Sequence, residues 1–197
     1  INHLHHIISS EDFLQQKSLG GEIPFFIAPF EAKDQLEIDA ELKGLKNRLV
    51  NAGVSVLELN LYDLSMEIID KELGTEEIFA LEQEMDKDEF KEALQSVLDI
   101  HEVLMPVIRE RINASQAKVY FLTGIGLVFP FIRSHNILNN LQNIAKKAPT
   151  VAFFPGEYNG QSLDLFGLLK MITTTGPSTL NNTTLKHDTQ RYFCKKH

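Results

Sequence analysis

Residues 118–167, KVYFLTGIGLVFPFIRSHNILNNLQNIAKKAPTVAFFPGEYNGQSLDLFG, decide the fold. An apolar run at Val119–Leu122 ends in the glycine turn Thr123–Gly126, a helical pattern follows over 130–147, and a second apolar run occupies 150–154. Short apolar runs separated by turn residues and a helical pattern predict a βαβ unit. The loops of such a unit leave the carboxyl ends of parallel strands, which is where open α/β sheets bind ligands.

Two further strands are expected before this unit, at 23–28 and 54–61, with a helix over 33–50 between them. That helix is predicted from apolar residues at helical spacing, namely Leu36, Ala40, Leu42, Leu45 and Leu49. A short helix is also expected to begin at Ser9, a favoured capping residue.

Residues 62–117 separate the second and third strands by more than a standard crossover needs, and they have helical character. Asp63 is expected to cap the first of these helices, and Pro106 to kink or divide the last, because proline interrupts a helix. The predicted fold class is therefore α/β: a mainly parallel sheet of about four strands flanked by helices, with a helical insertion between strands 2 and 3. We expect residues 1–170 to form one domain.

Composition limits the possible functions. The 197 residues are 43% hydrophobic and 23% charged, which suits one compact domain. No apolar run approaches the roughly 18–20 residues that cross a bilayer, and the single cysteine, Cys194, favours a cytoplasmic protein without a disulfide framework. The net charge of −8 argues against direct nucleic-acid binding, which needs a basic face.

The candidate binding residues follow the predicted strands. Backbone N–H groups of Thr123, Gly124 and Gly126 are placed to hold an anion, although glycines in such a turn also serve simply to reverse the chain. Arg133 and His135 fall near the start of the next helix, where they either meet an anionic partner or form a solvated face. The third glycine of a dinucleotide fingerprint and the lysine of a P-loop are both missing.

A second group of candidates ends the last predicted strand. The strand is expected to end at Phe154, and the residues from Gly156 to the tight turn at Asn159–Gly160 to close it. Tyr158 on this loop is either an anchor for a partner or only an edge residue of an interface. The amino-terminal histidines (His3, His5 and His6) are interpreted as part of a frayed terminus rather than as metal ligands. No catalytic residue, cofactor or metal site is predicted.

Several segments together resemble the BrxB family of BREX bacteriophage-exclusion systems. They are Ile23–Phe26, Thr123–Gly126, Val128–Pro130, Arg133–His135, Phe153–Gly156, Gly160–Leu163 and Leu165–Gly167. The resemblance implies a role in phage defence inside an assembly that includes a methyltransferase, an ATPase and PglZ, an alkaline-phosphatase-like protein. For a small member without catalytic motifs it implies an adaptor, with PglZ as its direct partner. The alternatives are a degenerate nucleotide-binding protein that uses Gly124–Gly126, and a nucleic-acid-binding subunit that uses Arg133, Lys146 and Lys147.

Residues 171–197 differ in character from the rest of the chain. They are rich in threonine and asparagine, with four Lys/Arg against one Asp, whereas the preceding residues have 15 Lys/Arg against 26 Asp/Glu. Adding one G before a codon set for Met171–Ser178 yields Asp-Asp-Asn-Tyr-Tyr-Arg-Ala-Phe, which resembles the corresponding family segment. We therefore predict that this polar tail is frameshifted.

Overall fold

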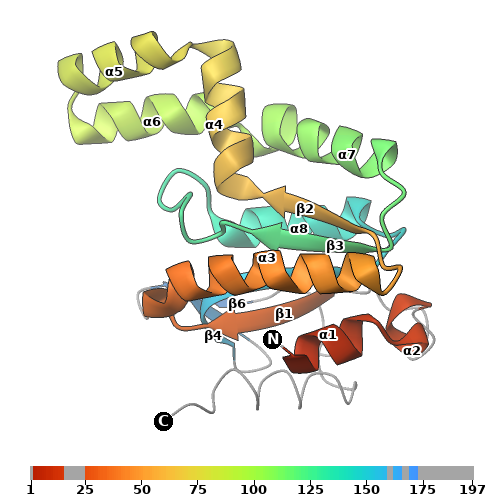
Figure 1. Ribbon diagram of the computed structural model, residues 1–197. Helices are drawn as coiled ribbons and strands as arrows, with labels where there is room; N and C mark the ends of the chain where they lie inside the picture. Colours follow the sequence, from red (N-terminus) through yellow and green to blue (C-terminus); the bar gives the residue numbers. More distant parts are fainter. Residues whose placement is uncertain (1, 16–24, 159–161, 166–168, 173–197) are drawn as a thin grey trace.

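Four parallel strands form the centre of the computed structural model, which describes residues 2–15, 25–158, 162–165 and 169–172 (Figure 1). They are β1 (Phe25–Phe30), β2 (Val56–Asn60), β3 (Val119–Thr123) and β4 (Thr150–Tyr158), in the spatial order β2–β3–β4–β1. Each neighbouring pair is parallel, with Asn60 opposite Thr123 and Phe30 opposite Pro155. The predicted α/β fold with a parallel sheet is confirmed.

One face of the sheet is covered by α3 (Gln35–Asn51), which follows β1 after the 3₁₀ turn η1 (Ala32–Asp34). The helix agrees with the predicted range, but its buried residues are Ile38, Leu42, Leu45 and Leu49. Leu36 is 84% exposed, so its assignment to the apolar face was wrong. It precedes Ile38 by two residues, or about 200° around a helix, and therefore points away from the sheet.

The amino-terminal segment packs on the same side as α3. It consists of α1 (Asn2–Ile8) and α2 (Glu11–Leu14), in which Leu4, Ile8 and Phe13 are buried. Ser10, one residue after the predicted start, caps α2 by accepting a hydrogen bond from the backbone N–H of Phe13. The expectation of a frayed terminus was wrong, because α1 has an apolar side to bury against α3.

The other face is covered by the helices that follow β2 and β3. The predicted insertion consists of α4 (Leu61–Glu72), α5 (Thr75–Glu84), α6 (Lys87–Val97), the π-helical turn η2 (Ile100–Leu104) and α7 (Met105–Ala114). Pro106 lies in the first turn of α7, directly after η2, whereas the chain is interrupted earlier, at Leu98 and Asp99 between α6 and η2. The helix between β3 and β4 is α8 (Ser134–Ile144); it begins four residues later than expected, because turns occupy 125–131.

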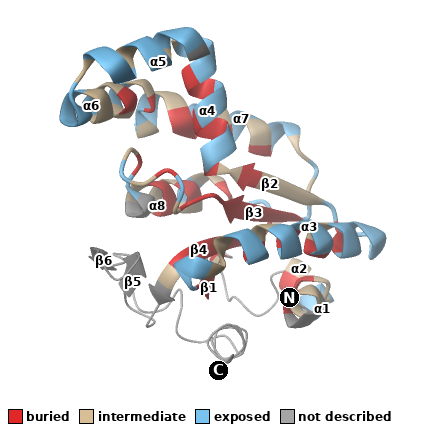
Figure 2. Cartoon of the chain, turned by 60° about the vertical axis from the view of Figure 1, so that its left-hand side comes forward, coloured by how far each residue is buried: buried red, intermediate tan, exposed pale blue. Residues whose placement is uncertain are grey.

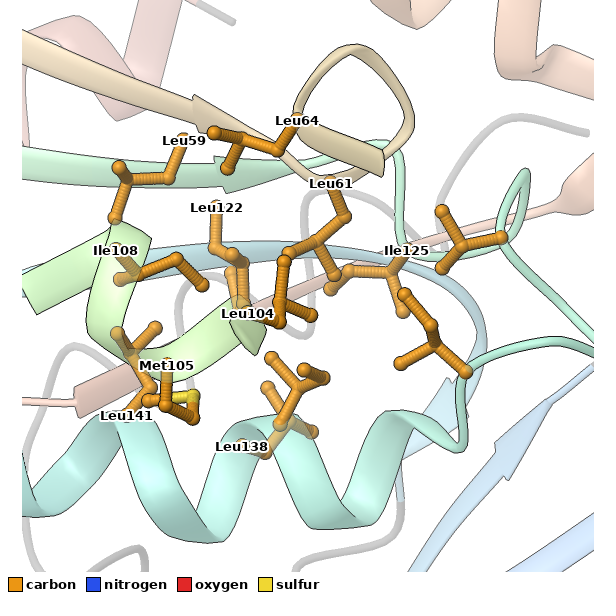
Figure 3. Close-up of a cluster of buried hydrophobic side chains, with 14 of the residues drawn as sticks. Leu59, Leu61, Leu64, Leu104, Met105, Ile108, Leu122, Ile125, Leu138 and Leu141 are labelled. Carbon is orange, nitrogen blue, oxygen red and sulfur yellow. The ribbon is translucent and has the colours of Figure 1, made fainter. Parts of the chain in front are cut away.

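The sheet separates two hydrophobic cores. Val119 and Phe121 of β3 face the core under α3, whereas Tyr120 and Leu122 face the core under α4, α7 and α8. Figure 3 shows leucines of β2, β3, α4 and α8 meeting Leu104, Met105 and Ile108 in the second core. Burial on both faces explains why β3 is continuously apolar.

An antiparallel extension continues the sheet from β4. β5 (Ser162–Leu165) pairs with the end of β4, and β6 (Leu169–Ile172) pairs with β5. The prediction that the fourth strand ends at Phe154 was wrong, because Gly156 pairs with Leu165 and β4 continues to Tyr158. The tight turn predicted at Asn159 and Gly160 falls outside the described residues. β6 includes the first two residues of the predicted tail, and residues 173–197 lie outside the described part of the chain.

Candidate functional site

The carboxyl ends of β2 and β3 meet at one edge of the sheet. Asn60, the last residue of β2, caps α4: its Oδ1 accepts hydrogen bonds from the backbone N–H groups of Tyr62 at 3.0 Å and Asp63 at 3.4 Å. The expectation that Asp63 caps this helix was wrong. Strand and helix follow each other without a loop, and the Asn60 side chain satisfies two of the backbone N–H groups at the start of α4.

Gly124 follows β3 and lies directly against this cap. Its φ is +70°, a conformation that residues with a side chain rarely adopt. A Cβ at this position would lie 2.3 Å from Asn60 Oδ1 and 3.0 Å from the backbone nitrogen of Tyr62. The glycine is therefore required by close packing between the β3 turn and the start of α4.

The rest of the glycine turn extends outward from this contact. The backbone N–H of Leu127 donates to the carbonyl of Gly124 at 3.1 Å, so Gly126 lies within a closed turn. Ser134, the first residue of α8, comes ten residues after Gly124. A glycine loop that binds phosphate normally leads straight into a helix, and this one does not.

Thr123 faces the interior rather than the edge. It is 3% exposed, and its Oγ1 donates to Glu58 Oε1 of β2 at 2.9 Å. The other carboxylate oxygen of Glu58 is paired with Lys46 of α3. This chain of side chains joins α3, β2 and β3 below the edge, so the role of Thr123 is to hold the elements of the site together.

Arg133 and His135 lie where β3 is connected to α8. Arg133 is exposed and occupies the capping position of α8 with an extended backbone, while His135 lies in the first turn. Lys146 and Lys147 follow the other end of this 11-residue helix, about 16 Å away at 1.5 Å per residue. Lys147 Nζ donates to Asn113 Oδ1 at 3.2 Å. The structure therefore does not bring the three basic residues into one patch.

Gly156 and Tyr158 lie in the part of β4 that extends past the parallel sheet. Phe30 of β1 makes the last parallel pair, with Pro155, and beyond it Gly156 and Tyr158 pair with Leu165 and Leu163 of β5. The predicted residues are thus distributed over the carboxyl side of the sheet. The glycine turn is packed against α4, and Gly156 and Tyr158 belong to the antiparallel extension.

Exposed apolar side chains at this edge were missed by the sequence analysis. Tyr62 is 43% exposed and Met66 42%, one turn apart on α4, and Leu127 on the glycine turn is 47% exposed. We call Tyr62, Met66 and Leu127 the rim residues. The four-residue spacing of Tyr62 and Met66 was a usable signal, but apolar residues at that spacing also predict a buried face.

The rim residues suit apolar contact better than acid–base chemistry. Among the described residues, no group of three or more His, Cys, Asp or Glu side chains is placed to hold a metal ion. In the same part of the chain, no helix has both the length and the apolar character needed to span a membrane.

Comparison with known proteins gives one family. The family model described as "BREX protein BrxB" matches residues 57–173. A protein of that name from Bacillus cereus (strain H3081.97) is 33% identical over 167 residues, covering 83% of this chain and 86% of the relative. Another from Escherichia coli O9:H4 (strain HS) is 24% identical over 184 residues, covering 88% and 91%. No solved structure is significantly similar.

Proposed function

Because the chain belongs to the BrxB family of BREX proteins, we propose that it is a non-catalytic adaptor in a bacterial phage-defence system. Membership in this family implies other BREX components as its partners. The direct partner in this proposal is PglZ, and the contact surface is the carboxyl edge of the sheet with its rim residues.

The proposal rests on the exposure of the rim residues on a rigid frame. Tyr62 and Met66 belong to a helix whose first turn is capped by Asn60, and Leu127 belongs to a turn that packs against the same cap. Aromatic and large apolar side chains contribute most of the energy of a typical interface, and they do so best when they are held in place before binding.

The polar side chains near the edge also support an adaptor, because they are already bonded to one another. Glu58 is paired with Lys46, and Thr123 donates to Glu58, so these groups already serve the fold. A general base needs a carboxylate or imidazole within reach of a substrate proton. The rim residues themselves, Tyr62, Met66 and Leu127, supply neither a carboxylate nor an imidazole.

Co-purification with PglZ tests the proposal. The full chain and the variants Tyr62→Ser and Leu127→Ser are each co-expressed with tagged PglZ, and affinities are then measured with the purified proteins. Each rim variant is expected to weaken binding at least tenfold, or about 1.4 kcal/mol. Leu36→Ser on α3 is the matched control, because Leu36 is also a large exposed apolar residue.

The outcomes separate the two parts of the proposal. Equal binding by the wild type and both rim variants would show that the carboxyl edge is not the contact surface. If the wild type binds another BREX protein but not PglZ, the adaptor role stands with a different partner. Turnover of a substrate by the purified protein, lost in a rim variant, would contradict the adaptor role itself.

A further inference from the structure

The helices α5 and α6 form an arm that projects from the body of the protein (Figure 1). α6 packs against α4, with Leu94 buried and Phe90 and Val97 half-buried against the second core. α5 lies on the outer side of α6, and Figure 2 shows that most of its surface is exposed. None of residues 76–84 is buried, so α5 is a helix whose outer face has no partner within the described chain.

The outer face of α5 has an aromatic side chain at its centre. Phe79 is 58% exposed, whereas its neighbour Ile78 packs against the second core. Residues three positions away are neighbours on a helix surface, so Phe79 lies between Glu76 and Glu82, both of which are exposed. Phe79, Glu76 and Glu82 are called the α5 face below.

The arm holds most of the net negative charge of the chain. Residues 75–97 contain eight Asp/Glu and two Lys, a net charge of −6, whereas the whole chain has a net charge of −8. Nucleic acid and anionic membrane surfaces have the same sign as this arm, and repulsion disfavours both as occupants of the α5 face. A basic protein surface has the opposite sign, and charge complementarity of this kind accelerates and orients association.

We infer that the α5 face docks a partner protein through a basic surface with an apolar pocket that receives the Phe79 ring. A buried aromatic anchor surrounded by charges that pair at the rim is the usual arrangement of a strong protein interface. The α5 face lies on another helix than the rim residues; along α4, Tyr62 is about 15 Å and Met66 about 9 Å from the end that leads into the arm. The inference therefore adds a second protein contact to the adaptor.

The test uses the full-length chain immobilised on a sensor. The probes are the other proteins of the same BREX system, each purified and applied separately at low and at physiological salt. The variants are Phe79→Ser and the double substitution Glu76→Lys with Glu82→Lys. At least one probe is expected to bind the wild type, and to bind each variant at least about tenfold more weakly. Added salt should lower the affinity of this probe for the charge variant less steeply than its affinity for the wild type.

Matched controls come from α3. Leu36→Ser removes another large exposed apolar side chain, and Glu37→Lys with Glu41→Lys reverses two exposed acids on another helix. Both controls are expected to bind within about twofold of the wild type. Circular dichroism of every variant confirms folding, which these exposed positions should leave intact.

Three results would overturn the inference. The first is that no probe binds the wild type. The second is that the α5 variants bind as the wild type does, or no more weakly than the α3 controls. The third is a wild-type dimer in light scattering that Phe79→Ser dissociates, because the occupant would then be a second copy of the chain. Tyr62→Ser, measured beside these variants, reports on the rim residues separately.

Discussion

Asn60 and Gly124 depend on each other. The Asn60 side chain can cap α4 only because residue 124 has no Cβ, and the turn after β3 can approach α4 only because the cap is compact. Two elements that are far apart in sequence are thereby joined at the proposed contact surface.

Substitution of Gly124 by alanine tests this dependence. The left-handed backbone conformation costs about 1–2 kcal/mol for a residue with a side chain. The new Cβ also displaces Asn60 from its cap, which costs roughly 0.5–2 kcal/mol more. Gly124→Ala should therefore lower the free energy of unfolding by about 1.5–4 kcal/mol, as measured by urea denaturation.

Gly53→Ala is the matched control for this substitution. Gly53 has a φ of +77°, but nothing lies within 4 Å of the position that a Cβ would occupy there, so only the backbone cost should appear. In an Asn60→Ala background, Gly124→Ala should cost less than it does alone, because the clashing oxygen is gone. Equal losses for Gly53→Ala and Gly124→Ala would show that the contact with Asn60 is unimportant.

At the level of elements, burial determined which strands and helices could be predicted. β3 was predictable because both of its faces are buried, which leaves a continuous apolar run between polar residues. The range of α3 was also predictable, but its inward face was assigned wrongly. Leu36 is apolar yet exposed, and an exposed leucine cannot be distinguished from a buried one by residue type alone.

The elements that were missed depend on long-range pairing. β5 is a four-residue strand that pairs with β4, and β4 itself continues through Pro155 and Gly156, which are normally turn residues. Likewise, Pro130 is acceptable in a first helical turn, but α8 begins only at Ser134. Local preference favoured a turn or a helix start at these positions, and tertiary contacts decided otherwise.

Only part of the candidate site could be predicted, because the rest of it also depends on contacts between distant segments. Thr123 and Gly124 were identifiable as strand-end residues of a βαβ unit, whereas their partners Glu58 and Asn60 come from another strand. Exposure of Tyr62 and Leu127 depends on which surface the chain leaves uncovered. Strand order and surface exposure are properties of the assembled sheet and have no local signal.

The start of α6 offers a prediction at the same level. Asp86 accepts hydrogen bonds from the backbone N–H groups of Asp88 and Glu89, both at 2.9 Å, and Glu89 accepts one in return from the backbone of Asp86. Loss of such a capping box costs about 1 kcal/mol of helix stability. Asp86→Ala should therefore speed hydrogen exchange of the amides of α6 roughly fivefold, as measured by mass spectrometry.

Glu92→Ala is the control for the lost charge, because Glu92 is an exposed acid on the same helix away from the cap. Its effect on exchange in α6 should be less than about twofold, the size expected for a surface substitution. An equal effect of the two substitutions would mean that charge, rather than the capping geometry, sets the stability of the arm.

At the level of the whole molecule, stability should be distributed unevenly. The sheet lies between two cores that bury residues of every parallel strand, whereas the arm projects from the body and contacts it through the packing of α6 against α4 and of Ile78 against the second core (Figure 1). Segments with few buried apolar contacts open locally without unfolding of the rest. In the proposed adaptor, one partner therefore binds the stable body at the rim residues. The second partner binds the less stable arm at the α5 face and would stabilise it.

Hydrogen exchange of the isolated wild-type protein measures this distribution directly. Amides of β3, all of whose residues are buried, should exchange slowest, at the rate of global unfolding. Amides of α5, where residues 76–84 include no buried side chain, should exchange fastest among the helices from α3 to α8. A probe that docks on the α5 face should slow exchange in α5 and leave β3 unchanged, because binding stabilises the state that it selects. Protection of α5 equal to that of β3 in the isolated protein would contradict this account, since the arm would then unfold only together with the sheet.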